Sequence, residues 1–168
     1  EAQVFIGQRA RLGEGCHLNV DHDDVLAVTK VWINCVIADG KVVGVLGTGL
    51  DLSRFVAEVV DIPQTGVTAM FVDRAGAVQA HRDASLVDFH SITKDLANKK
   101  TVFALLDRPE DRAQMRAMLA RVTSDEVRVE SRFMHMAGRE VLVGVGYLDR
   151  LGWYNVTLME VDKVIDRS

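Results

Sequence analysis

The chain has 168 residues, of which 48% are hydrophobic and 26% charged, and its formal net charge is −4. This composition is typical of a globular protein and excludes a disordered chain. The negative charge argues against a nucleic-acid-binding surface, which would be basic. No apolar run approaches the roughly eighteen residues that a membrane-spanning helix needs. Because the chain begins at Glu1 and carries no signal-peptide pattern, we expect it to be a processed or excised piece.

The first part of the chain carries weak patterns. Residues 1–15 fit a frayed strand or a short helix, residues 17–20 alternate like a strand, and residues 21–24 are typical of a polar loop. Several ligand-type side chains gather here, namely His17, Asp21, His22, Asp23 and Asp24. Their spacing matches neither a calcium-binding loop nor a zinc-binding helix, so we expect a solvated acidic loop and no metal site.

Val25–Ala38 predicts a strand with two different faces. One parity is wholly apolar and includes Val31, Ile33, Cys35 and Ile37, so we expect this face to meet the core. The other parity places Lys30, Trp32 and Asn34 next to one another on the opposite face. An indole beside an amide on a strand is typical of the wall of a binding pocket.

Ala38–Phe55 is the most distinctive stretch of the chain. An Asp-Gly turn leads into the valine- and glycine-rich run 42–50, which predicts the returning strand of a hairpin. A similar sequence recurs at Ala137–Leu151: aligning Gly40 with Gly138 gives five identities over twelve positions. The similarity predicts a structural repeat.

Residues 53–61 have the apolar spacing of a short helix, with Asp51 or Ser53 as its N-cap. Residues 62–66 break the pattern and are the best candidate for a domain boundary. We therefore expect one unit at 1–62, a second at 63–161 and the start of an outgoing helix at 162–168; the resemblance described below implies that 1–62 is the remnant of a module with a link helix.

The second module begins with a hairpin, Val67–Asp73 and Ala77–Arg82, around a turn that contains Gly76. Residues 85–96 are typical of a loop with a short helix, and residues 101–106 are too few to assign by period. A helix is predicted at Pro109–Val122, because proline suits a first turn and Met115, Met118, Leu119 and Val122 form an apolar stripe. Three strands are predicted to close the chain, at Val127–Met136, Glu140–Tyr147 and Trp153–Val161.

Five strands with helices inserted after the second predict an α+β fold with helices on one face of an antiparallel sheet. This is the element order of a PAS-like module. The fold class expected is therefore α+β, a PAS-like antiparallel five-stranded sheet with helices on one face; the resemblance described below implies that part of a second such module precedes it.

The two cysteines, Cys16 and Cys35, permit two interpretations. Cys35 lies in an apolar alternation, so the simplest expectation is a buried free thiol. A Cys16–Cys35 bridge in an oxidising compartment stays open, because sequence does not fix its geometry.

A set of short motifs resembles the double-Cache extracytoplasmic sensor domains of bacterial signalling receptors. The motifs are Trp32-Ile33-Asn34, residues 40–45 (GKVVGV), Gly49-Leu50-Asp51-Leu52, Phe71-Val72-Asp73 with Gly76, residues 80–83 (AHRD), and Leu151-Gly152-Trp153-Tyr154. The likeness covers Leu18 to about Val161 and is greatest to the sensors placed before HAMP segments, diguanylate cyclases or PP2C-type phosphatases.

The resemblance implies two stacked PAS-like modules on the outer face of the bacterial inner membrane, flanked by two spanning helices that this chain does not contain. Residues 1–62 would supply only the later strands of the membrane-distal module. The long N-terminal helix, the first distal strands and the Arg-Trp-Tyr cluster that recognises amino acids in this family are not visible.

Two groups of residues are candidates for a ligand site. Asn19, Asp21, Trp32 and Asn34 would suit a small polar or cationic ligand through charge pairing and cation–π contact, unless Trp32 simply packs in the core and Asn34 satisfies a strand end. Asp73 and His81 lie at the ends of the hairpin that borders the proximal pocket in the resembled family. Turn chemistry and surface ion pairs are the alternative for these two, together with Arg82 and Asp83.

No motif indicates an enzyme. Gly44, Gly47 and Gly49 form G-x-x-G-x-G rather than a dinucleotide fingerprint, and no G-x-S-x-G, H-E-x-x-H or P-loop occurs. We expect an extracytoplasmic (periplasmic) ligand-sensing domain of a membrane-bound receptor, a homodimer without cofactor, which binds a small molecule and no nucleic acid. A ligand-free dimerisation spacer and, less favoured, a small hydrolase are the alternatives.

Overall fold

The computed structural model describes residues 15–23, 28–39, 41–89, 94–124, 128–149 and 151–164. The chain divides into two compact units: the first is Glu1–Arg54 with Phe89–Asp95, and the second is Phe55–Asp88 with Leu96–Ser168. The strand or helix expected at 1–15 falls almost wholly outside the described residues. The assignment of 1–62, 63–161 and 162–168 to a remnant module, a proximal module and an outgoing helix stays a prediction.

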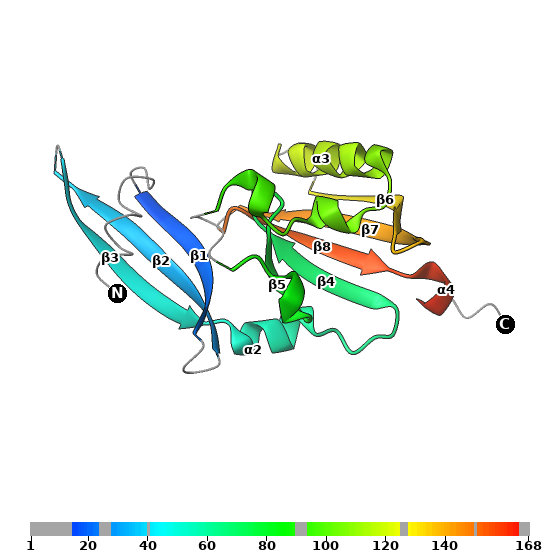
Figure 1. Cartoon of the computed structure of the whole chain (residues 1–168), viewed down its shortest axis with the longest axis horizontal. Helices are drawn as coiled ribbons and strands as arrows, with labels where there is room; N and C mark the ends of the chain where they lie inside the picture. The colour runs from blue at the N-terminus through cyan, green and yellow to red at the C-terminus, as the bar shows by residue number, and fades with distance from the viewer. Residues whose placement is uncertain are drawn as a thin grey trace. The chain divides into compact units, whose positions relative to one another are not determined.

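The first unit contains an antiparallel sheet of three strands in the order β1-β2-β3 (Figure 1). The strands are β1 (Gly15–Asp23), β2 (Val28–Ala38) and β3 (Val42–Asp51). The polar loop expected at residues 21–24 is wrong for its first three residues. They continue β1 because Asp21, His22 and Asp23 pair with Lys30, Thr29 and Val28 of β2, and Asp24 lies outside the described residues.

The apolar face of this sheet is only partly buried. Val20 and Val31 are buried, but Ile37, Leu46 and Leu50 are 48%, 66% and 55% exposed. The expectation that Ile37 meets the core is therefore wrong. Alternation gives the direction in which a side chain points, whereas burial also needs a covering layer.

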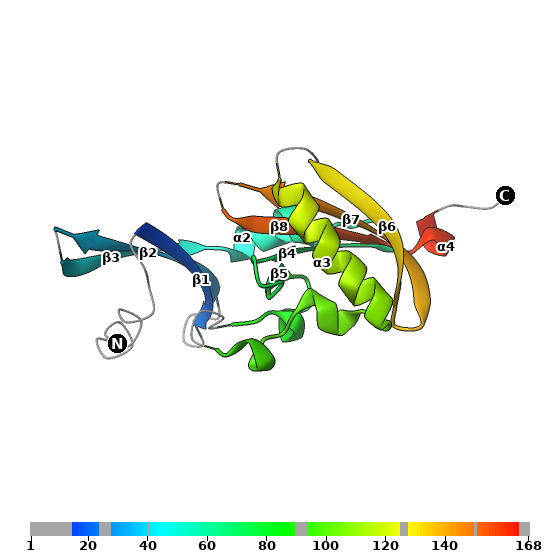
Figure 2. The ribbon, with the colours of Figure 1, turned by 90° about the horizontal axis from the view of Figure 1, so that it is seen from above.

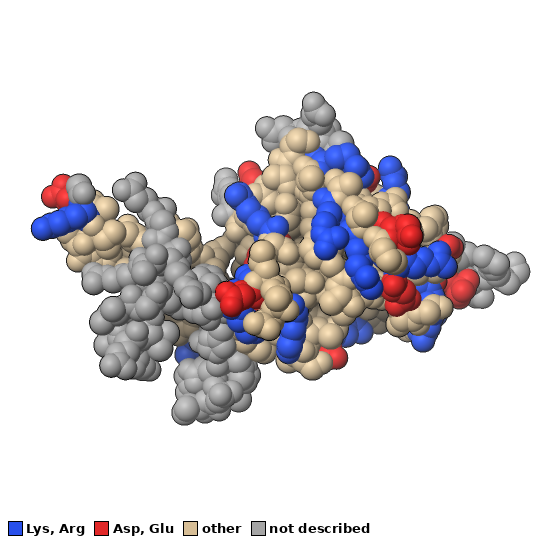
Figure 3. Space-filling model, turned by 45° about the horizontal axis from the view of Figure 1, so that its top comes forward, with Lys and Arg blue, Asp and Glu red and all other residues tan. Residues whose placement is uncertain are grey.

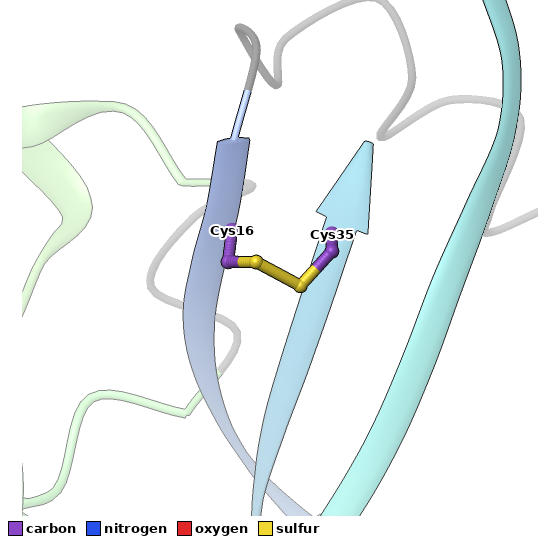
Figure 4. The surroundings of a disulfide bond; sticks show 2 residues. All are labelled: Cys16 and Cys35. Carbon is purple, nitrogen blue, oxygen red and sulfur yellow. A yellow bond between two sulfur atoms is a disulfide. The ribbon is translucent and has the colours of Figure 1, made fainter. Parts of the chain in front are cut away.

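Cys16 and Cys35 form a disulfide with an S–S distance of 2.05 Å, so the expectation of a free thiol is wrong (Figure 4). The two residues are direct partners in the antiparallel register of β1 and β2. That register brings their Cβ atoms within the distance that a bridge requires.

The second unit is built on an antiparallel sheet of five strands in the order β5-β4-β8-β7-β6. Its strands are β4 (Val67–Val72), β5 (Val78–His81), β6 (Val129–Met136), β7 (Arg139–Leu148) and β8 (Trp153–Met159). The last strand lies in the middle, between the first strand and the next-to-last one. This arrangement confirms the expected α+β, PAS-like fold class.

One long helix, α3 (Pro109–Thr123), lies across one face of this sheet (Figure 2). Its apolar stripe of Met115, Met118, Leu119 and Val122 is buried, as predicted, against the sheet residues Met70, Met134 and Val143. Shorter 3-10 segments connect β5 to α3: η2 (Ala84–Leu86), η4 (Leu96–Asn98) and η5 (Val102–Leu105). The sheet and α3 therefore enclose the main hydrophobic core.

The remaining helical segments are short. The predicted helix at 53–61 consists of α2 (Ser53–Phe55) continued by a π-helical turn, η1 (Val56–Val60). The last described segment is α4 (Val161–Val164). Among the described residues, no helix combines the length and apolarity that crossing a membrane would require.

The two similar stretches both form the returning arm of a hairpin, but they occupy different places. β7 is flanked by β6 and β8 and buries Val141, whereas β3 is an edge of its sheet and leaves the aligned Val43 53% exposed. In chain order, β3 corresponds to β8 and not to β7, since β3 and β8 are each the final strand of their unit and are followed by a helix. The two similar sequences therefore share a hairpin turn and the strand after it, but they do not occupy equivalent positions in the fold.

Candidate functional site

Four of the predicted site residues occupy one face of the three-stranded sheet. The register pairs Asn19 with Trp32 and Asp21 with Lys30, and it pairs Asn34 with His17. Direct partners in an antiparallel sheet lie on the same face. We call this set of positions on β1 and β2, together with their partners on β3, the polar face. The side chains of Asn19 and Asp21 lie outside the described part.

Trp32 is the largest side chain described on the polar face. Its ring lies against Gly49, its partner on β3, so that a Cβ on Gly49 would be 3.0 Å from the ring atom Cζ3. Lys30 Nζ lies 5.7 Å from the centre of the ring, within the range of a cation–π contact. Gly47, the partner of Asn34, also lacks a side chain. On β3, this face therefore presents only glycine opposite Trp32 and Asn34.

Among the side chains described on this face, Asn34 is the most buried polar one, with 4% of its surface exposed. Within the part of the chain that the structure describes, its Oδ1 atom has no hydrogen-bond partner. A buried acceptor without a partner costs about 1–3 kcal/mol, so such atoms need an explanation. A donor supplied by a bound molecule would satisfy it.

Asp51 ends β3 on the same face, as the partner of Lys30. Its Oδ1 accepts a hydrogen bond from the backbone N–H of Ser53 at 2.8 Å, as expected for a helix-capping residue. The bonds from Ser53 and the charge of Lys30 lower the pKa of Asp51 below its usual value. The polar face therefore carries a fixed carboxylate beside a lysine.

Asp73, a predicted site residue in the second unit, organises the turn between β4 and β5. Its Oδ1 accepts the N–H groups of Ala75 and Ala77, each at 2.9 Å, and its Oδ2 accepts from Gln79 at 3.2 Å. These bonds are the turn chemistry that the sequence left open as the alternative. The ligand role of Asp73 stays a prediction.

His81 ends β5 and is 9% exposed. Its Nδ1 accepts the backbone N–H of Asp83 at 2.9 Å, which places the proton of the neutral ring on Nε2. Desolvation is the main cause that lowers the pKa of His81 below its usual value. Its bond is to its own hairpin, and its ligand role also stays a prediction.

A cavity of about 190 Å³ in the second unit was not predicted from the sequence. It lies where β4 and β7 begin and β8 ends. Its apolar wall contains Met136, Val141 and Leu158, which belong to or pack against the core under α3. Thr68, Arg139 and Glu160 supply its polar lining, and Asp73 and His81 do not line it. We call it the Arg139 cavity.

An ion-pair network lies at the rim of the Arg139 cavity. Arg139 Nη1 donates to Glu160 Oε2, and Lys163 Nζ donates to Glu160 Oε1 at 3.0 Å. The bond from Lys163, together with that from Arg139, lowers the pKa of Glu160. Basic and acidic side chains are interspersed over the face of the second unit that Figure 3 presents. No sequence pattern indicates this cavity, because its lining comes from segments that lie far apart in the chain, from Gly66 to Glu160.

Metal ligation finds no support in the described ranges. There, no three His, Cys, Asp or Glu residues are grouped so that they could hold a metal ion. In the acidic stretch that could have suggested a metal, the side chains of Asp21, His22 and Asp23 are not described, and Asp24 lies outside those ranges.

Comparison with models of known protein families and with curated protein sequences gives no match. Solved structures do match. The ligand-binding domain of the Pseudomonas aeruginosa PAO1 amino acid chemoreceptor PctB, in complex with L-Gln, has a TM-score of 0.60 at 15% identity, over 92% of this chain and 55% of that one. The ligand-binding domain of the Pseudomonas fluorescens chemoreceptor CtaA, in complex with L-alanine, has a TM-score of 0.53 at 19% identity, over 88% and 56%.

A third match is the extracellular domain of the putative histidine kinase mmHK1S-Z2, with a TM-score of 0.57 at 13% identity, over 94% of this chain and 55% of that one. The chain thus spans a little over half the length of these structures. Together they show that it has the fold of the Cache-type sensor domains. The finer likeness to the sensors of diguanylate cyclases or PP2C-type phosphatases stays a prediction.

Proposed function

We propose that the chain is an extracytoplasmic ligand-sensing domain of a membrane-bound signalling receptor. The observation that carries the proposal is the fold shared with ligand-binding domains of chemoreceptors and of a histidine kinase over most of this chain. The disulfide between Cys16 and Cys35 agrees with an oxidising compartment outside the cytoplasm. The domain itself carries no catalytic activity in this proposal.

The proposed ligand site is the polar face, where Asn34 supplies a buried acceptor that has no partner among the described residues, beside Trp32. A hydrogen-bond donor such as an ammonium, hydroxyl or amide N–H group would satisfy Asn34, and a cationic group would suit the indole. Asn19 and Asp21 share the face by register. The ligand class is therefore a small polar or cationic molecule. The relatives were solved with amino acids, which fit this class.

Signalling would proceed by a shift in population. A ligand that binds one packing of the domain better than another stabilises that packing by its difference in binding free energy. About 1–3 kcal/mol is a usual coupling energy for such a change. We propose a homodimer as the signalling form, with membrane helices supplied by parts of the receptor beyond this chain.

A thermal-shift screen of small polar and cationic compounds on the purified chain tests the proposal. At least one compound should raise the melting temperature in a concentration-dependent manner. Asn34→Leu should remove the shift while leaving the fold intact, because leucine has a similar volume and needs no donor. Thr48→Val is the matched control, since Thr48 is exposed and its partner Ile33 belongs to the other face. Loss of the shift in both variants, or in neither, would contradict the site.

The spacer alternative has one observation in its favour. Ile37, Leu46 and Leu50 form an exposed apolar surface on the other face of the same sheet, and such surfaces often mark contacts between proteins. A spacer would dimerise in sedimentation experiments and show no ligand-dependent shift. A dimer that also binds a ligand through Asn34 would support the sensor.

A further inference from the structure

We propose that the Arg139 cavity is a second ligand site, which takes a small monocarboxylate with a short apolar chain. The proposal rests on the proposed function only for its signalling consequence, since binding at this cavity can be measured without a receptor. None of the residues predicted from the sequence as ligand-binding lines it.

The cavity combines an apolar interior with a cationic rim. Met136, Val141 and Leu158 form the interior wall and are continuous with the core of the second unit. Arg139 lines the rim, and Lys163 lies next to it through the shared partner Glu160. An apolar chain with a negative group at one end matches this division into two environments.

Arg139 retains hydrogen-bonding capacity. A guanidinium group carries five N–H donors, and in the described part of the chain Arg139 donates one bond, from Nη1 to Glu160. Two cations, Arg139 and Lys163, share this single carboxylate. The neighbouring carboxylate of Asp107 is held by the backbone N–H groups of Ala137 and Gly138, at 3.1 and 2.8 Å. A second carboxylate at the rim would therefore meet a favourable charge, and arginine pairs with carboxylates in a bidentate manner.

The volume sets the size of the ligand. The 190 Å³ of the cavity correspond to roughly six water volumes of about 30 Å³ each. A molecule with about six non-hydrogen atoms fills such a space, and butyrate has this size.

The cavity lies at the start of α4. The backbone N–H of Glu160, the residue before α4, donates to the carbonyl of Gly66 at 2.7 Å, and Lys163 lies within α4. Gly66 is so close that a Cβ there would be 2.7 Å from the Cβ of Lys163. A carboxylate bound to Arg139 competes with Glu160 and so weakens one of the contacts that hold the start of α4. Ligand binding would in this way change the packing of the last described helix.

Isothermal titration of the intact 168-residue chain with sodium butyrate, at constant ionic strength, tests the proposal. Saturable binding is expected for butyrate, and binding at least about tenfold weaker is expected for the neutral analogue butyramide, since a hydrogen bond to a charged group contributes about 1.5–3 kcal/mol. Equal heats for butyrate, butyramide and sodium chloride would overturn the proposal.

Variants locate the site. Arg139→Gln should lower the affinity for butyrate at least about tenfold, and Glu160→Gln should raise it by removing the competing carboxylate. Arg132→Gln, on the exposed edge strand β6, is the matched control and should leave the affinity unchanged. If circular dichroism shows that Arg139→Gln is unfolded, Arg139→Lys keeps the charge but loses the bidentate geometry and should weaken binding severalfold. Equal affinity in the Arg139 and Arg132 variants would overturn the proposal.

The two proposals fail separately. Butyrate binding that persists in Asn34→Leu and is lost in Arg139→Gln supports the Arg139 cavity whatever becomes of the polar face. A ligand whose binding depends on Asn34, in a chain that does not bind butyrate, supports the sensing function and overturns the second site.

Discussion

The indole ring of Trp32 lies against Gly49 of the neighbouring strand, with three ring carbons 3.0–3.2 Å from the position that a Cβ on Gly49 would occupy. A methyl group at that position would force the ring to move by a few tenths of an ångström. Because Trp32 borders the buried acceptor Asn34 on the same strand, its position sets the shape of the proposed ligand site. Gly49 thus contributes to the site by lacking a side chain.

Gly49→Ala should therefore move the indole ring, shift the tryptophan emission and be less stable than Gly44→Ala. Urea unfolding and fluorescence measure the two effects. Gly44→Ala is the matched control in the same strand, because no atom lies within 4 Å of the added Cβ. Equal effects of the two substitutions would show that Trp32 does not pack against Gly49 in solution.

Reduction of the Cys16–Cys35 disulfide should destabilise the first unit. The bridge joins residues that are 19 positions apart, and closing a loop of this size contributes about 3 kcal/mol in the chain-entropy account. The double substitution of both cysteines by serine should increase hydrogen exchange in β1 and β2 by about a hundredfold or more. Exchange in β7 and β8 provides the internal reference. Unchanged exchange in β1 would contradict a structural role for the bridge.

Gly76 and Gly138 allow backbone strain to be separated from crowding. Both have a left-handed backbone, with φ of +79° and +73°. A Cβ on Gly76 would be 2.4 Å from Cε2 of Phe103, whereas nothing lies within 4 Å of one on Gly138. Gly138→Ala should cost about 1 kcal/mol from conformation alone, and Gly76→Ala should cost clearly more. Denaturant unfolding checks this order, and a larger cost at Gly138 would contradict the described packing of Phe103.

His81 should make the stability of the second unit depend on pH. Its folded pKa is depressed mainly by desolvation, so between its folded value and the unfolded value near 6.5 the unfolded chain binds more protons. Stability should therefore fall as the pH is lowered from about 7.5 through 6.5. His81→Asn keeps an acceptor near Asp83 N–H and should flatten this dependence. Thermal melts between pH 5.5 and 7.5 measure it, with His135→Asn as the control. An equally steep dependence in His81→Asn would exclude His81 as its source.

The local elements of the second unit could be predicted because local signals determine them. Pro109 and the methionine stripe mark α3, and Gly76 marks the hairpin between β4 and β5. Their assembly follows from the requirement that the helix stripe and one sheet face bury each other. The element order alone then indicates a PAS-like module.

The disulfide and the burial pattern of the first unit could not be predicted in this way. Whether Cys16 meets Cys35 depends on the register between β1 and β2, which is set by pairing over the whole length of both strands. The exposure of Ile37 and the burial of Asn34 depend on which neighbours cover each face. The alternation of side chains along a single strand does not show which other elements will pack over each face.

The same distinction applies to the two candidate sites. The shared face of Asn19, Asp21, Trp32 and Asn34 could be anticipated in part, since Trp32 and Asn34 have the same parity on one strand. The Arg139 cavity could not, because Thr68 of β4, Arg139 of β7 and Glu160, which follows β8, come together only in the folded sheet.

The central claim is that the polar face holds a small molecule. Mass spectrometry of the compounds released from the purified chain, followed by titration with each compound found, tests it most directly. The account predicts a small polar or cationic compound that binds with one-to-one stoichiometry and that the folded Asn34→Leu variant neither retains nor binds. A correctly folded chain that releases no such compound and binds none of the screened ligands, or a ligand that Asn34→Leu binds equally well, would contradict it.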